Sequence, residues 1–151
     1  MVERLKTWWQ RLSSTALGRW FFSKILGWLI PYTGSIKPHI LELRPGFALV
    51  SIKDQRAKRN HLNSLHALAL ANLGELTTGL CLHFALKNGD QAILTKLEVD
   101  YLRKARGSIT AKSELSGEKL DGTVVVTARL CDRSGELVAI VNASWLVRQA
   151  R

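Results

Sequence analysis

Glu75 is the residue of this sequence whose type and position most directly suggest chemistry. It is the only formally charged side chain between Arg59 and Lys87, and its neighbours are almost all apolar or small. Poorly solvated surroundings raise the pKa of a carboxyl group, because burial disfavours the charged form. A carboxyl group with a raised pKa can act as a base near neutral pH, so Glu75 is the first candidate for a catalytic residue.

The segment that must position Glu75 is predicted to be a buried helix. From Leu65 to Leu80, leucines recur at helical spacing, while alanines and glycines fill most of the remaining positions. A helix that is apolar nearly all round is enclosed by protein and does not lie on a surface. We therefore expect Glu75 near the middle of an enclosed helix.

The start of this helix offers a second chemical feature. Asn63 or Ser64 is predicted to cap it, which leaves the backbone N–H groups of Ala67 and its neighbours among the donors without a partner inside the helix. These donors and the helix dipole favour developing negative charge. The helix start is therefore a candidate oxyanion-binding site.

His66 precedes Glu75 by nine residues. In a helix this spacing separates two residues by about 180° around the axis and about 13 Å along it. Their side chains cannot share a site within one chain. If both act on one substrate, the His66 end of one subunit's helix must face the partner subunit's Glu75.

Length and composition indicate one globular domain. The chain has 151 residues, of which 46% are hydrophobic and 23% charged, as is usual for soluble proteins. Cys81 and Cys131 lie in apolar patterns without CxxC spacing, so they are interpreted as reduced core residues of a cytoplasmic protein. The sequence contains no HExxH motif and no GxSxG elbow, which argues against metal-dependent hydrolysis and against a serine esterase.

The positive charge is concentrated in the N-terminal third. The net charge is +10, and residues 1–59 alone hold 11 basic and 3 acidic side chains, a net +8. A basic surface can attract a membrane, a nucleic acid or a phosphorylated ligand. No nucleic-acid-binding motif is present, so a nucleic-acid partner is not expected.

Residues 3–30 are predicted to form a basic amphipathic helix that carries Trp8, Trp9 and Trp20 on its apolar face. One interpretation is a helix that lies at a membrane interface. The favoured interpretation is a helix that packs its tryptophans against the rest of the fold. Arg19 and Lys24 interrupt the apolar stretch, which argues against a membrane span. The residues expected to end the helix are Pro31, Gly34 and Pro38.

The rest of the chain is rich in predicted strands. Alternating patterns bounded by turn residues predict strands over 36–43, 47–52, 93–102, 108–115, 123–131 and 137–147. The expected order is a helix, two strands, the buried helix and a four-strand meander. An antiparallel sheet of about six strands curled around one helix is an α+β layout. Such a sheet leaves one apolar flank of the helix uncovered, and a second copy of the chain is expected to cover it.

This order, with Asn60-His61-Leu62-Asn63-Ser64-Leu65-His66 at the helix start and an acid nine residues after His66, resembles the hotdog-fold thioesterase superfamily. The nearest likenesses are the phenylacetic-acid-degradation and 4-hydroxybenzoyl-CoA thioesterase branches. Closer still is an uncharacterised branch with an extra N-terminal helix. The resemblance covers roughly residues 36–148, which divides the chain into an N-terminal amphipathic helix and linker, 1–34, and a hotdog domain, 35–151.

The resemblance implies a role for each candidate residue. Glu75 would be the general base or the nucleophile, and His66 would polarise a thioester. Asn60 and Asn63 would orient water or the substrate carbonyl. The residues implied to contact substrate are Ala67, Leu68, Thr78, Arg103, Lys104 and Arg106, the last three at the phosphates of coenzyme A. The expected substrate is an acyl-CoA or acyl-carrier thioester, with no cofactor beyond that coenzyme A and no metal, and the expected assembly is a homodimer or tetramer.

The sequence departs from the family where His-Gly-Gly becomes His66-Ala67-Leu68. In the family the glycines let a thioester approach the helix backbone closely, and side chains at these positions crowd that approach. Three hypotheses therefore stay open. They are a thioester hydrolase, a non-catalytic protein that binds acyl thioesters or fatty acids, and a membrane-associated protein that meets lipids through residues 1–30.

Overall fold

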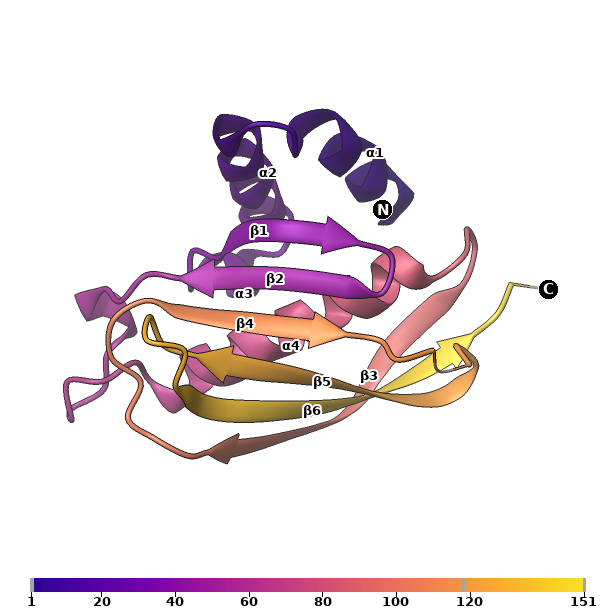
Figure 1. Cartoon of the computed structure of the whole chain (residues 1–151). Coiled ribbons are helices and arrows are strands. Elements are labelled where there is room, and N and C mark those ends of the chain that lie inside the picture. Colours follow the sequence, from indigo (N-terminus) through magenta and orange to yellow (C-terminus); the bar gives the residue numbers. More distant parts are fainter. Residues whose placement is uncertain (1, 118, 151) are drawn as a thin grey trace.

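The structure is a computed structural model that describes residues 2–117 and 119–150. Three helices precede the first strand, and one long helix separates the first two strands from the last four (Figure 1). The helices are α1 Val2–Leu12, α2 Ala16–Leu29, α3 Pro31–Gly34, the 3₁₀ turn η1 Arg56–Lys58 and α4 Ala67–Ala85. The strands are β1 His39–Arg44, β2 Phe47–Ile52, β3 Gln91–Tyr101, β4 Ile109–Glu114, β5 Gly122–Cys131 and β6 Leu137–Arg148.

The six strands form one antiparallel sheet in the order β1-β2-β4-β5-β6-β3. This confirms the expected α+β layout, but the predicted four-strand meander is wrong. Only β4, β5 and β6 follow one another across the sheet, whereas β3 pairs with β6 at the far edge and β4 pairs with β2. The helix α4 crosses the sheet from the side of β2 to the edge opposite β1, and β3 forms that edge. The next strand, β4, therefore has to cross back to pair with β2.

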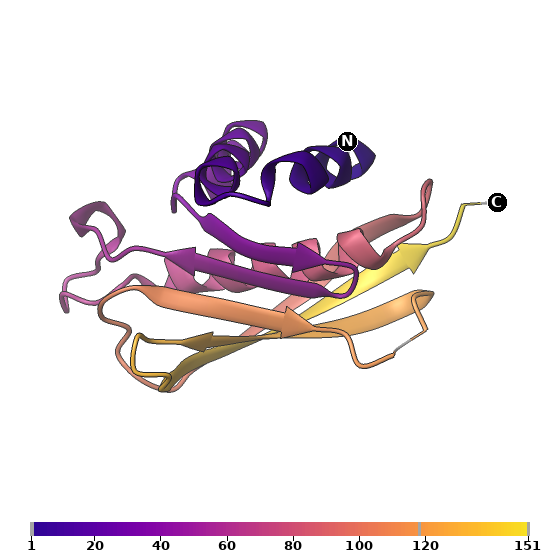
Figure 2. The same ribbon diagram turned by 45° about the horizontal axis from the view of Figure 1, so that its top comes forward.

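The long helix α4 lies on the concave face of the sheet, and the strands curve around it (Figures 1 and 2). Leu73 and Leu82 are completely buried. At Gly74 the helix approaches β6 so closely that an added Cβ would collide with the side chain of Val141. The predicted buried helix is thus confirmed, and it is held against the sheet at a glycine.

The N-terminal segment is not the single helix predicted over 3–30. Residues 13–15 separate α1 from α2, and Thr15 caps α2 by accepting a hydrogen bond from the Gly18 N–H at 3.0 Å. A threonine in extended conformation at this position satisfies a helix donor that would otherwise lack a partner. Pro31, expected to end the helix, opens the short helix α3, because proline is compatible with the first turn of a helix.

Helices α1 and α2 lie beyond β1, at the edge of the sheet opposite β3 (Figure 1). Trp9 is buried there, donates its indole N–H to the Leu43 carbonyl at 2.9 Å and packs edge-on against Phe22. The packing interpretation is therefore confirmed for Trp9. Across residues 2–117 and 119–150, no helix is both long and apolar enough to cross a membrane.

Candidate active site

The N-terminus of α4 is built differently from the predicted cap at Asn63 or Ser64. Leu65 is still extended and donates its N–H to the Ala105 carbonyl at 2.8 Å, so helical geometry begins only at Ala67. His66 is the N-cap, and its Nδ1 accepts the Leu68 N–H at 3.1 Å. Because Nδ1 is an acceptor here, a neutral His66 ring carries its proton on Nε2.

The two asparagines of this segment shape the loop that leads to α4. The Asn60 side-chain oxygen accepts the N–H groups of Leu62 and Ser64, at 2.9 and 3.2 Å. Asn63 has a left-handed backbone, with φ of 54°, and its side-chain oxygen accepts a hydrogen bond from Arg59 at 3.0 Å. Asparagine is among the residues that tolerate this conformation best. Both side chains therefore make loop hydrogen bonds in the single chain.

A pocket of about 350 Å³ opens beside the start of α4 and is called the helix-start pocket below. It lies between α4, the loop before it and the segment that follows β3. Its lining residues are Asn60, Leu62, Ser64, Leu65, Ala67, Leu70, Tyr101, Leu102, Arg103, Lys104 and Ala105. Four residues predicted to belong to the site, Asn60, Ala67, Arg103 and Lys104, are thus brought together.

Two polar groups at the start of α4 lack a partner among the residues that the structure describes, and so does the buried Trp145 indole N–H elsewhere in the fold. Ser64 is 4% exposed, and its hydroxyl has no hydrogen-bond partner within the described residues. The Ala67 N–H, at the first position of α4, likewise donates to no group in the ranges that the structure covers. A buried polar group without a partner costs free energy unless water or a ligand satisfies it. The helix-start pocket is therefore suited to a ligand oxygen.

Tyr101 is a pocket residue that the sequence analysis did not identify as part of the site. Its hydroxyl donates to the Ala67 carbonyl at 2.9 Å, which fixes the end of β3 to the start of α4. The alternating pattern over 93–102 predicted a strand, but alternation carries no information about which helix end the hydroxyl of Tyr101 meets. The same holds for Ser64, which the sequence suggested only as a helix cap.

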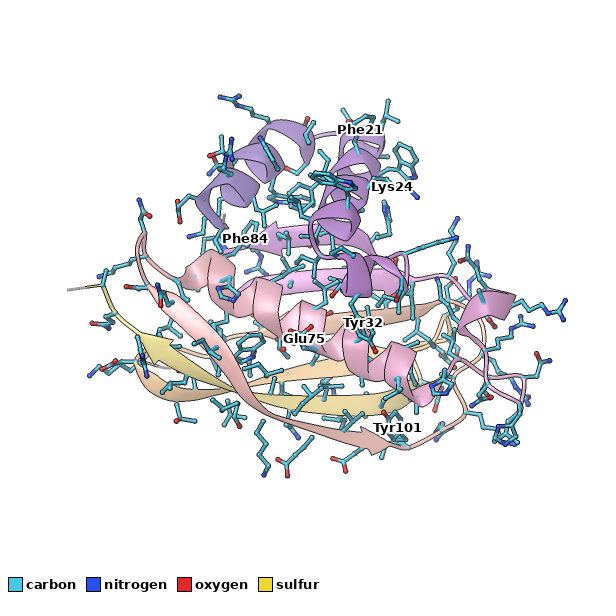
Figure 3. All side chains as sticks on the ribbon, turned by 180° about the vertical axis from the view of Figure 1, so that it is seen from behind. Phe21, Lys24, Tyr32, Glu75, Phe84 and Tyr101 are labelled. Atoms are coloured by element: carbon cyan, nitrogen blue, oxygen red, sulfur yellow. The ribbon has the colours of Figure 1, made fainter. Side chains whose placement is uncertain are left out.

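Glu75 lies two helical turns beyond the pocket and is not among the residues that line it. Its side chain is partly buried, and desolvation raises its pKa above the usual value of 4.5. No ion pair or hydrogen bond reaches its carboxylate from any described residue. Figure 3 shows Glu75 midway along α4 and Tyr101 near the start of that helix. The predicted rise in pKa is confirmed in direction, and one chain does not unite Glu75 with the helix start.

Thr78, Leu68, His66 and Arg106 lie outside the helix-start pocket, while Arg103 lines it and also forms an ion pair. Thr78 is completely buried and donates its hydroxyl to the Glu75 carbonyl at 2.9 Å. Leu68 is 62% exposed and, with His66, lines a separate pocket that also involves Tyr32. Arg103 pairs with Glu136 at 2.9 Å on the surface. Arg106 is exposed outside the helix-start pocket.

Apolar side chains are exposed near the start of α4 and along the edge strand β3. Leu62, Leu68, Tyr101 and Leu102 are exposed near the helix start, and Ile93 is exposed at the opposite end of β3. An edge strand also presents backbone groups that can pair with another strand. This face has the features of an interface between chains.

A six-stranded antiparallel sheet curled around one long helix is the hotdog fold that the sequence resemblance predicted, and solved structures described as thioesterases share this fold. Residues 18–147 match the family described as "Domain of unknown function (DUF4442)", and the chain belongs to that family. No curated protein matches the chain.

Three solved structures illustrate the similarity. A structural-genomics crystal structure of no stated organism or function is 30% identical, with a TM-score of 0.86, and the match covers 97% of this chain and 99% of that one. A Pseudomonas aeruginosa protein described as a probable thioesterase is 22% identical, with a TM-score of 0.74 over 85% and 93%. A phenylacetic-acid-degradation-related protein from Ralstonia eutropha is 18% identical, with a TM-score of 0.68 over 77% and 89%. The two less similar structures establish the shared fold.

Proposed function

We propose that this protein hydrolyses acyl thioesters, with coenzyme A or an acyl-carrier protein as the thiol, and that Glu75 is its catalytic carboxylate. The observation that supports this most strongly is a desolvated acid with no partner in the described chain. An acid retained for stability would be expected to accept hydrogen bonds when it is buried. Glu75 instead keeps both oxygens available for a reacting molecule.

The proposed site is shared between two chains. Glu75 lies eight residues beyond Ala67, which separates them by about 12 Å along α4. That distance exceeds what one thioester carbonyl and its attacking water can span. Two copies joined through the β3 edge would place the helix-start pocket of one chain opposite the partner subunit's Glu75. We therefore propose a homodimer, or a tetramer of such dimers, with two composite sites per dimer.

In the proposed reaction, the substrate carbonyl lies in the helix-start pocket and accepts a hydrogen bond from the Ala67 N–H. The partner subunit's Glu75 removes a proton from water, and the resulting hydroxide attacks the carbonyl carbon. The oxyanion is stabilised by the N–H and by the positive end of α4. Collapse expels the thiolate, which is then protonated. In the alternative route Glu75 attacks directly and forms an acyl-enzyme anhydride, which mass spectrometry of the intact protein during turnover would detect.

The chemistry of the pocket also suggests how the thiol carrier is bound. Arg103 and Lys104 line the pocket mouth, and Arg106 follows them closely in sequence. These cations are suited to the phosphates of coenzyme A or of a phosphopantetheine arm. His66 lines the separate pocket and caps α4, so it is assigned the positioning of the helix start, while Asn60 and Asn63 hold the loop in shape. No metal or additional cofactor is part of this proposal.

The proposal is tested by measuring thiol release from a panel of short, medium, long and aromatic acyl-CoAs. We expect turnover of at least one class, and Glu75→Gln is expected to lower it by about 10² to 10⁴-fold, the usual range for loss of a general base. Glu42→Gln, at an exposed position of β1, is the matched control. Retained turnover in a folded, dimeric Glu75→Gln protein would refute the assigned role.

A second candidate function is binding of acyl thioesters or fatty acids without hydrolysis. Leu68 favours it, because its exposed side chain stands at the helix start where a thioester would have to approach. Saturable binding of acyl-CoA by calorimetry, without any thiol release from the panel, would select this function. Release of thiol would exclude it. The protein's place in the cytoplasm and its contact with membranes through residues 1–30 stay proposals as well.

A further inference from the structure

A groove of about 540 Å³ lies between the N-terminal helices and the β1–β2 hairpin, away from the helix-start pocket. It is called the lysine groove below. Its lining residues are Trp20, Ser23, Lys24, Gly27, Gly34, Lys37, Pro38, His39, Ser51, Lys53, Gln55 and Lys58. Four lysines and a histidine therefore face the groove, and no acidic residue of the described ranges lines it.

The lysines of the groove form no ion pair with any described residue. None of the four has a carboxylate within ion-pair distance in the part of the chain that the structure describes. Lys58 is 6% exposed, and its ammonium group donates to the Lys53 carbonyl at 2.9 Å. The nearby Asp54 is bound to Arg59 at 2.7 Å. Asp54 attracts Lys58 from a distance but is directly paired with Arg59, so a bound anion would further stabilise the Lys58 ammonium group.

The charges of the groove act on one another. Burial, followed by the repulsion of Lys37, lowers the pKa of Lys58. Burial, followed by the charges of Arg19 and Lys53, lowers the pKa of His39. The groove is therefore a region of positive potential, and its chemistry is suited to a phosphate group.

The outer side of α2 beside this groove is apolar and exposed. The residues of this aromatic face are Leu17, Trp20, Phe21 and Trp28 on α2, and Trp28 is 79% exposed. Figure 3 shows Phe21 and Lys24 on α2 away from the sheet. Soluble proteins rarely expose so many large apolar side chains together unless they bind something.

The aromatic face and the lysine groove are continuous. Trp20 and Lys24 belong to the groove wall, and the Lys24 ammonium lies 5.5 Å from the centre of the Trp20 ring. Trp20 also packs edge-on against Phe21. A partner that covers the aromatic face would therefore also meet the lysines.

The charge of this surface decides which partner it fits. A second copy of the chain would place lysines against lysines in a symmetric contact, which is repulsive. An anionic bilayer offers negative phosphates at its surface and an apolar layer just beneath. Tryptophan and tyrosine side chains are enriched at that boundary because one end is apolar and the other polar.

We propose that α2 and α3 dock this protein onto anionic membranes, with the aromatic face in the interfacial layer and the phosphate of a lipid headgroup in the lysine groove. The sequence suggested a membrane contact through residues 1–30 as one helix with Trp8, Trp9 and Trp20 on its apolar face, and the structure narrows that contact to α2 and α3. In the structure Trp9 is buried and Trp8 is partly buried against the core, so α1 presents no such face. Docking is independent of the proposed hydrolysis.

The experiment is flotation of the full chain with phosphatidylcholine vesicles and with vesicles that also contain phosphatidylglycerol. We expect binding to the anionic vesicles, weaker binding as salt is added, and a blue shift of tryptophan emission as the exposed indoles leave water. Failure to bind either kind of vesicle would overturn the proposal. So would equal binding to both kinds, because the lysines would then contribute nothing.

Variants separate the two parts of the surface. Phe21→Ser and Trp28→Ser remove apolar contact, while Lys24→Glu and Lys37→Glu reverse charge in the groove. Each lysine change is expected to weaken binding at least fivefold, since one basic residue near an anionic surface contributes about 1 kcal/mol. Val125→Ser and Lys119→Glu, exposed positions on another part of the molecule, are the matched controls. Equal losses in the controls would contradict the proposed surface.

A further arm distinguishes a lipid headgroup from free phosphate. Inorganic phosphate is added to the protein in a thermal-melting assay at an ionic strength matched with chloride. Stabilisation by phosphate together with no vesicle binding would replace the membrane proposal with a soluble phosphate ligand. Thiol release from soluble acyl-CoA is measured on the same variants and is expected to stay unchanged. A failure of docking is thereby separated from a failure of hydrolysis.

Discussion

Glu75 owes its altered acidity to the apolar side chains around it and not to a charged neighbour. Desolvation is the cause of its raised pKa. The sequence made this predictable, because a single acid in a run of leucine, alanine and glycine has few ways to remain solvated. The hydrogen bonds of the helix start were harder to predict, since Asn63, Ser64 and His66 are all chemically able to cap a helix.

The acidity of Glu75 leads to a pH-dependent prediction for stability. In the folded chain its pKa lies above 4.5, so between 4.5 and the raised value the folded state holds a proton that the unfolded state has released. The resulting stabilisation is complete below the unfolded pKa and is lost as pH rises through the folded pKa. Glu75→Gln, which stays neutral, should therefore gain thermal stability over the wild type as pH approaches neutrality.

The measurement is a series of thermal melts of both proteins from acidic to neutral pH. The difference between variant and wild type should be smallest below pH 4.5 and should grow with pH. A difference that shrinks as pH rises would mean that the charged form of Glu75 is stabilised in the folded protein, contrary to its desolvation.

The proposed role of the Ala67 N–H as an oxyanion donor is testable with one substitution. Ala67→Pro removes the N–H, and proline is tolerated at the first position of a helix. His66 already has the extended backbone, with ψ of 141°, that a residue before proline prefers. Turnover should fall by about 10² to 10³-fold, the usual cost of losing one oxyanion donor. Ala67→Val keeps the N–H and controls for added bulk.

Kinetic measurement of both Ala67 variants decides between the two explanations of any loss. The proposed role predicts a large loss in kcat for proline and a small one for valine. Similar losses in both variants would indicate crowding at the helix start and would leave the N–H without a catalytic part.

At the scale of the elements, the close contact between α4 and β6 sets how the helix sits in the sheet. Gly74→Ala would drive a methyl group into Val141 and should lower the free energy of unfolding by about 1–3 kcal/mol. Gly79→Ala is the matched control in the same helix. There the added Cβ would lie 3.2 Å from the Trp145 ring, and the helix propensity of alanine, about 1 kcal/mol better than glycine, offsets this contact.

Chemical denaturation of the two glycine variants measures these differences. A Gly74→Ala protein as stable as the wild type would show that α4 can shift away from β6 at little cost. In that case the position of Glu75 would be less firmly fixed than the packing around Gly74 indicates.

The sequence predicted the existence of the elements better than their arrangement. All six strands and the buried helix were identified, because alternation and apolar periodicity are local signals. The pairing partners of β3 and β4 were not identified. They depend on which edge of the sheet the chain reaches at the end of α4, and no local sequence pattern indicates that. The break between α1 and α2 was missed for a different reason. Ser13, Ser14 and Thr15 are compatible with a helix surface as well as with a cap.

For the whole molecule, the two edges of the sheet have different surroundings. The β1 edge lies beside α1 and α2, with the lysine groove and the aromatic face on that side. The β3 edge and the helix-start pocket lie at the other side, where apolar residues are exposed next to unpaired strand backbone. This separation would let one face bind a membrane while the other pairs with a second chain.

The central claim is that one thioester is cleaved by groups from two chains, and subunit mixing tests it most directly. Glu75→Gln lacks the base, and Ala67→Pro lacks the oxyanion donor, so each homodimer should be nearly inactive. In a mixed dimer one of the two composite sites is intact, because it combines Ala67 of the Glu75→Gln chain with Glu75 of the Ala67→Pro chain. The other site carries both substitutions. Thiol release by purified mixed dimers should therefore return to about half of the wild-type rate, because one of two sites is restored. Mixed dimers as inactive as both parents would contradict the account.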